Sequence, residues 1–142
     1  MSRDVIALEG VIGELVALEV TQFADRDWCR GIDYAAGSHS TVTDDSGCLF
    51  GATPATFDDA SLAAFKDVRD TLDATGVAVS DVTVWRDASG IVTKVEFTLR
   101  AGMFDRFSYV FEPGAPLPEE MPHEEEYTRI DPDWYFWWED WN

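Results

Sequence analysis

The sequence contains few basic residues. Its 142 residues include 10 Lys and Arg against 28 Asp and Glu, so the net charge at pH 7 is −18. Binding to nucleic-acid backbones and to anionic membranes depends on Lys and Arg, and we therefore expect neither as a direct partner. A field of this sign attracts cationic proteins and raises their association rates. The shortage of basic residues thus predicts a basic protein as the partner.

Cysteine and histidine are also scarce, with two of each: Cys29, Cys48, His39 and His123. Their spacings match none of the compact ligand pairs of structural zinc sites, and the acidic pairs lack the alternating ligands of a calcium loop. A catalytic nucleophile would need a base that a third group orients, and no such set stands out. We expect no metal, no cofactor and no enzyme. The cysteines are expected to be reduced, with a disulfide between them left open.

The sequence lacks a long apolar run. Glu9, Glu14 and Glu19 interrupt the apolar residues near the N-terminus, a pattern that fits neither a signal peptide nor a helix that spans a bilayer. We therefore expect a cytoplasmic protein. Hydrophobic residues make up 46% of the chain, enough for one buried core. The length predicts a single domain over residues 1–142.

Two segments have the spacing of amphipathic helices. Apolar residues recur at intervals of three and four along residues 4–24 and predict a first helix there. A second helix is predicted from an N-cap at Thr56, Asp58 or Asp59 to Gly76, because short polar side chains cap helix N-termini and glycine suits the residue after the last turn.

Alternating apolar and polar residues predict strands at residues 28–34, 82–86, 91–100 and 104–111, with a hairpin of short strands within 35–50. The short connections between the later strands favour antiparallel pairing. The prediction is an α+β fold, in which an antiparallel sheet of about five strands is covered on one face by two helices.

The C-terminal part of the chain is acidic and rich in proline. Residues 113–126 are predicted to form an exposed loop, because its prolines lack backbone donors and have a fixed φ. From residue 113 to residue 142 there are nine acidic residues and one basic residue, a net charge of −8. The acidity is therefore concentrated at this end.

Residues 131–142 are rich in aromatic side chains and have two interpretations. In a helix, Asp131 would be the N-cap, Pro132 would take the first turn, and four tryptophans would share one stripe: Trp134, Trp137, Trp138 and Trp141. In a strand, Trp134, Phe136 and Trp138 would lie on one face, with Tyr135 and Trp137 on the other, and aromatic residues favour strands. We slightly favour the helix.

Exposed tryptophan beside acidic residues is typical of a binding hot spot for Arg and Lys. The candidate partner-binding residues are Asp44, Asp45, Glu119, Glu120, Glu124, Glu125, Glu126, Asp133, Trp137, Glu139, Asp140 and Trp141. Two alternatives stay open. Tryptophan also stacks on sugars, which would fit a carbohydrate-binding or carbohydrate-active protein, and the acidity alone would fit a housekeeping domain of a salt-adapted lineage.

The order of these elements resembles a known family. After the second helix, the chain reads VTVW, then DASGIVTKVEFTL, then FDRFSYVFEPG. Over about residues 58–111 this is similar to the small acidic immunity proteins of bacterial polymorphic toxin systems, most nearly the YezG-like group. The resemblance implies an antitoxin that binds the toxin domain of a secreted effector, often a nuclease, and blocks it without chemistry of its own.

Overall fold

The fold was analysed in a computed structural model that describes residues 2–26, 29–35, 37–42, 57–100, 105–120 and 125–140. In these residues the chain forms two helices, α1 (Arg3–Ala17) and α2 (Asp59–Thr75), and eight strands. The strands are β1 (Gln22–Arg26), β2 (Cys29–Tyr34), β3 (Gly37–Val42), β4 (Val79–Arg86), β5 (Val92–Leu99), β6 (Asp105–Phe111), β7 (Glu125–Asp131) and β8 (Trp134–Asp140).

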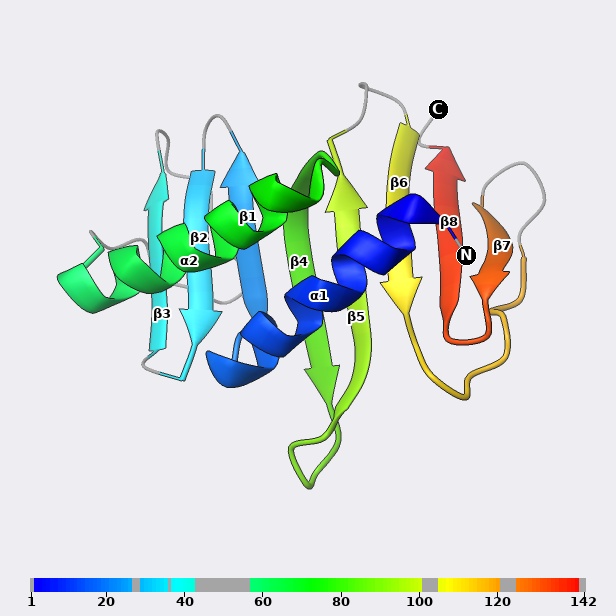
Figure 1. The fold of residues 1–142 in the computed structure, drawn as a ribbon, viewed down its shortest axis with the longest axis horizontal. Coiled ribbons are helices and arrows are strands. Elements are labelled where there is room, and N and C mark those ends of the chain that lie inside the picture. Colours follow the sequence, from blue (N-terminus) through cyan, green and yellow to red (C-terminus); the bar gives the residue numbers. More distant parts are fainter. Residues whose placement is uncertain are drawn as a thin grey trace.

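The strands form one antiparallel, open sheet in the order β3-β2-β1-β4-β5-β6-β8-β7. Both helices lie on the same face of this sheet, with α2 over β1 to β4 and α1 running diagonally toward β6 (Figure 1). The predicted α+β class, with two helices on one face of an antiparallel sheet, is confirmed. The sheet is wider than the predicted five strands, because strands also form in segments that were predicted as helix and loop.

The second helix is confirmed almost to the residue. The Asp58 side chain accepts a hydrogen bond from the backbone N–H of Ser61 at 2.7 Å, which satisfies one free donor of the first turn. The helix ends at Gly76, whose φ of 75° is in the left-handed region that glycine adopts without a steric penalty.

The first helix is shorter than predicted. It ends at Ala17, and Glu19 turns the chain with a φ of 53°. Phe23 continues the apolar spacing of the helix in sequence, but it lies in β1 opposite Ile32 of β2 and Val82 of β4. Pairing with two neighbouring strands therefore decides the structure of this segment over its local periodicity.

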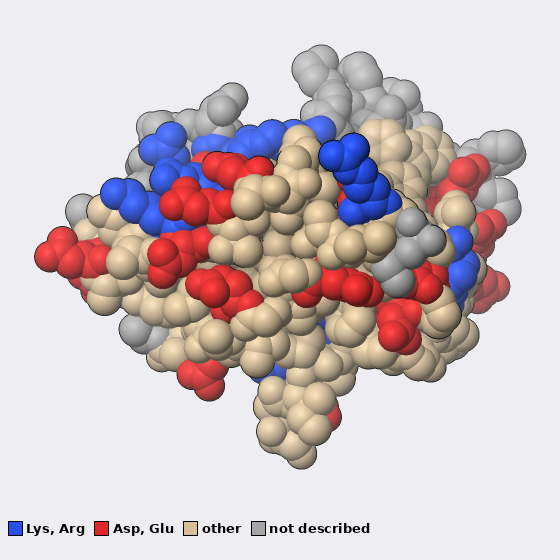
Figure 2. Space-filling model, in the orientation of Figure 1, with Lys and Arg blue, Asp and Glu red and all other residues tan. Residues whose placement is uncertain are grey.

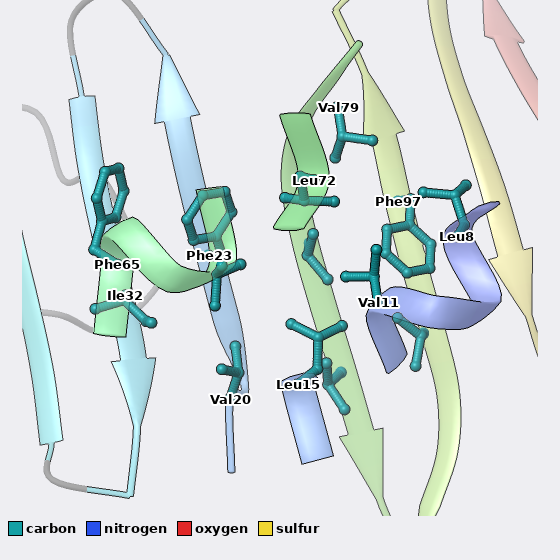
Figure 3. Close-up of a cluster of buried hydrophobic side chains, with 14 of the residues drawn as sticks. Leu8, Val11, Leu15, Val20, Phe23, Ile32, Phe65, Leu72, Val79 and Phe97 are labelled. Atoms are coloured by element: carbon teal, nitrogen blue, oxygen red, sulfur yellow. The ribbon is translucent and has the colours of Figure 1, made fainter. Parts of the chain in front are cut away.

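The main core lies between the helices and the sheet (Figure 3). Leu8, Val11 and Leu15 of α1 point toward the β4–β5 side, and Phe65 of α2 stacks on Phe23 with ring centroids 5.1 Å apart. These side chains are at most 2% exposed. The larger set of buried core residues is Val5, Leu8, Val11, Leu15, Val20, Phe23, Ile32, Ala64, Phe65, Val68, Leu72, Val79, Val82, Val84, Val95, Phe97 and Trp134.

The aromatic C-terminal segment is not a helix, so the interpretation that we favoured is wrong. Asp131 ends β7 instead of capping a helix, Pro132 and Asp133 form a turn, and β8 follows. Trp134 and Trp137 therefore lie on opposite faces of the sheet, as the strand alternative predicted. The physical reason is pairing: β8 bonds to β6 on one side and to β7 on the other, which a surface helix cannot do.

Cys29 is 2% exposed in β2 and disulfide-bonded, which differs from the reduced state that we expected. Cys48, the other cysteine of the chain, lies outside the described residues. Since disulfides are uncommon in a reducing cytosol, the cytoplasmic location stays a prediction. Neither described helix is long and apolar enough to cross a membrane.

Candidate functional site

The face of the sheet away from the helices, here called the helix-free face, carries a second group of buried side chains. Val110 of β6 and Tyr135 of β8 lie opposite each other in the ladder and are 1% and 2% exposed. Both lie outside the main core. Burial on a face that neither helix covers indicates that loop and strand residues have closed over this part of the sheet.

A pocket of about 180 Å³ lies above Val110 and Tyr135 on this face. It is lined by side chains of β5, β6, β8, β7 and the proline-rich segment: Lys94, Glu96, Val110, Pro118, Tyr127, Tyr135 and Trp137. The ladder positions them, because Glu96 lies opposite Val110, and Trp137 lies opposite both Ser108 and Tyr127. We call this the open-face pocket.

Glu96 provides the carboxylate of the pocket. Its side chain is 13% exposed, and its Oε1 lies 3.3 Å from Thr98 Oγ1, 3.3 Å from Ser108 Oγ and 3.5 Å from Arg106 Nη2. Among the described residues, Oε2 accepts no hydrogen bond. A carboxylate has about four acceptor positions, so Glu96 has capacity to accept from another donor.

Two tyrosines form the aromatic walls, and both donate to carboxylates. Tyr127 Oη donates to Glu125 at 3.1 Å, and Tyr135 Oη donates to Glu112 at 3.1 Å. Burial raises the pKa of Tyr127 to about 12, with further contributions from the hydrogen bond to Glu125 and from the negative charges of Glu125, Glu139 and Glu96. Burial, followed by the charge of Glu112, raises the pKa of Tyr135 as well. Burial and the neighbouring carboxylates therefore both oppose ionisation of these hydroxyls.

The basic side chains near the pocket are stacked on aromatic rings. The Lys94 ammonium lies 4.7 Å from the centroid of Trp85 of β4, and Lys94 also lines the pocket. The Arg106 guanidinium lies 5.4 Å from the centroid of Trp137. Trp137 Nε1 is buried and has no hydrogen-bond acceptor among the described residues. This local chemistry shows that a guanidinium is accommodated between an indole and Glu96.

The structure brings some of the predicted partner-binding residues together. Glu125 and Glu139 lie opposite each other across β7 and β8, and Trp137 lies on the same helix-free face, two residues before Glu139 in β8. Glu120 is exposed in the loop before β7, and its carboxylate accepts from the backbone N–H of Tyr127 at 3.3 Å.

Other predicted residues are not part of this group. Glu126 points to the helix-covered face, since it lies opposite Trp138, and Glu119 and Asp133 are exposed in connections. The placement of Glu125 and Glu126 in the predicted loop was wrong, because both belong to β7. Asp140 ends β8. The predicted residues outside the described ones are Asp44, Asp45, Glu124 and Trp141.

The sequence prediction missed Glu96, Tyr127 and Tyr135. A signal for Glu96 exists in the sequence, because the alternation of residues 91–100 puts Glu96 on the polar face and Phe97 on the apolar face. Alternation does not show which strands are neighbours in the sheet. The strand order brings the two tyrosines of the last hairpin to the same pocket.

Comparisons with protein-family models, with curated proteins and with solved structures found no match for this chain. The likeness to small acidic immunity proteins therefore stays a prediction. In the part of the chain that the structure describes, no three side chains among His, Cys, Asp and Glu come together as metal ligands would.

Proposed function

We propose that this protein binds a cationic protein domain, a toxin of the nuclease type, and neutralises it by covering its functional surface. The observation that carries the proposal is the open-face pocket, where a carboxylate and aromatic walls lie together on a chain with a net charge of −18. Nucleases hold the phosphate backbone with Arg and Lys, and these are the side chains that such a surface recognises.

The size of the pocket supports binding of a protein over catalysis on a small molecule. Sites for drug-sized ligands and cofactors occupy about 300–1,000 Å³, whereas this pocket has about 180 Å³. A site of this size accommodates one protein side chain. An inhibitor that acts by occlusion needs no more, because its affinity comes from a few anchor residues within a larger contact area.

The carbohydrate alternative is less well supported by the same residues. Among the described residues, Trp85 is the tryptophan with an exposed side chain on the helix-free face, at 41% exposure, and Lys94 lies over its ring. Trp134, one of the tryptophans that suggested sugar stacking, is fully buried. We therefore pursue the protein partner.

The test is binding to the product of the adjacent gene, purified as its C-terminal domain. We expect a one-to-one complex that abolishes nuclease activity and whose association rate falls as NaCl is raised from 50 to 500 mM, because salt screens charges separated by more than about 8–10 Å. Absence of a complex at micromolar concentrations would refute the proposal.

A pair of charge variants separates a specific surface from general acidity. Acidic side chains are scattered over the helix-covered face, whereas Lys and Arg lie mainly toward the upper edge of the view, above α2 and near the start of α1 (Figure 2). Net charge alone could therefore attract a basic protein. The double variant Glu125→Gln/Glu139→Gln changes the helix-free face, and Asp67→Asn/Asp73→Asn makes the same change in net charge on α2. We expect only the first pair to slow association and weaken the complex. Equal effects would favour the salt-adapted alternative.

A further inference from the structure

The open-face pocket has features of a receptor for one particular side chain. Its floor is apolar, with Val110 and Tyr135 both buried, and Glu96 stands at its wall with a side-chain exposure of 13%. A partly buried carboxylate loses much of its hydration, so a charged donor that reaches it forms a stronger hydrogen bond than at an open surface.

We infer that the open-face pocket receives an arginine side chain of the cationic partner, whose guanidinium binds Glu96 and packs against the rings of Tyr127 and Trp137. The inference rests on the proposed function and names the residue type that this site recognises. It excludes an acidic or neutral side chain as the principal occupant.

Volume is the first argument for a side chain. An apolar cavity of about 150 Å³ holds a benzene molecule, and the open-face pocket is slightly larger, at about 180 Å³. A planar guanidinium with the end of its stem is of similar size. A nucleotide or a disaccharide is not.

The resident guanidinium is the second argument. Arg106 lies over the Trp137 ring at 5.4 Å from its centroid and 3.5 Å from Glu96 Oε1. Its side chain is 39% exposed, so this ion pair is long and partly hydrated and contributes little to stability. A partner arginine can therefore share the carboxylate through Oε2 or displace Arg106 toward solvent.

The surrounding charges are the third argument. Glu96, Glu125 and Glu139 all act on the Tyr127 hydroxyl, while Lys94 is directed to Trp85. Arginine suits this arrangement better than lysine, because its planar group stacks on aromatic rings and donates to a carboxylate through two parallel N–H groups.

The test uses capped pentapeptides with glycine around one central residue, followed by ¹H–¹⁵N NMR of the indole N–H of Trp137, assigned with Trp137→Phe. The probes carry arginine, citrulline or glutamate at the centre. Citrulline has the shape of arginine without its charge. We expect a saturable shift with the arginine peptide, at a millimolar Kd, and at least about tenfold weaker binding of the citrulline peptide, since a charged hydrogen bond accounts for about that factor.

Two variants assign the effect to the pocket. Glu96→Gln keeps the shape of the side chain and should weaken binding of the arginine peptide about tenfold. Tyr127→Ala removes one wall of the pocket, on an edge strand, and should also weaken binding. Glu119→Gln, on an exposed loop residue outside the pocket lining, is the matched control and should have no effect. Circular dichroism verifies that each variant is folded.

Equal binding of arginine and citrulline, preference for glutamate, no binding at all, or an unchanged Kd in Glu96→Gln would each overturn the inference. Two other outcomes distinguish failure of this inference from failure of the proposed function. If the adjacent gene product is inhibited while the arginine peptide does not bind, the function stands and the pocket assignment falls. If the peptide binds and no complex forms, the pocket assignment stands and the toxin proposal falls.

Discussion

Replacing Trp134 with alanine tests whether the C-terminal strand belongs to the core. The Trp134 side chain is fully buried, its ring centroid lies 6.0 Å from that of Phe97 and 5.4 Å from that of Phe111, and its Nε1 donates to Glu9 at 3.0 Å. Truncating a buried tryptophan to alanine costs about 3–5 kcal/mol of unfolding free energy. Glu9 is exposed, so its carboxylate returns to water at little further cost.

We therefore expect Trp134→Ala to lower the free energy of unfolding by about 4 kcal/mol. With an unfolding entropy of about 2.1 cal/mol/K per residue, the 142 residues give about 0.3 kcal/mol/K, so Tm should fall by about 13 °C. The assay is urea and thermal denaturation followed by circular dichroism. Trp85→Ala is the matched control: this tryptophan is 41% exposed, and its loss should cost about 1 kcal/mol. A loss below about 1 kcal/mol for Trp134→Ala would refute the placement of β8 in the core.

Two further predictions concern titration and an ion pair. Burial is the main reason why the pKa values of Tyr109 and Tyr127 are raised from 10.0 to about 12, so between these pH values the native state keeps protons that the unfolded state has lost. The contribution of these tyrosines to the free energy of unfolding should be fully present below pH 10 and should be lost as the pH rises toward 12. Urea midpoints measured across this range should fall less steeply in Tyr109→Phe and Tyr127→Phe. Asp81 accepts from Arg26 Nε at 2.8 Å and from Arg26 Nη2 at 2.7 Å, and 16% of the Asp81 side chain is exposed. Asp81→Asn should lower the free energy of unfolding by about 1–2 kcal/mol, measured by urea denaturation. The side chain of Asp70 is 71% exposed, so Asp70→Asn should lower it by less than about 0.5 kcal/mol. Equal costs for the two aspartates would contradict the geometry.

The parts of the fold that local chemistry determines were predictable. Asp58 and Gly76 define the ends of α2, because capping and left-handed backbone depend on residues within one turn. The segment from Gln22 to Arg26 was not predictable in the same way. Phe23 fits the spacing of α1 and the alternation of β1, and only its pairing with strands 9 and 59 positions away in sequence decides between them.

The C-terminal hairpin shows the same limit at the candidate site. Trp137 and Glu139 could be proposed from composition, because aromatic and acidic residues adjoin there. Their partners in the pocket could not, since β8 lies between β6 and β7 and the sheet order departs from the chain order. The position of β8 between β6 and β7 places Tyr127 and Tyr135 beside Glu96, which is about thirty positions or more away in sequence.

The helix-free face changes in character across the sheet, and the change coincides with the surface that we propose for binding. Over β4 to β6 it carries the polar side chains of Thr83, Thr98 and Ser108, of which Thr98 and Ser108 are buried and lie within hydrogen-bond distance of Glu96. Over β7 and β8 it carries rings, with Tyr127 and Trp137 opposite each other. Stable sheets bury an apolar face against a second layer, and on this side neither described helix adds to the loop and strand residues that cover Val110 and Tyr135. In the proposed function the partner covers the rest of this face, where aromatic rings and carboxylates occur together.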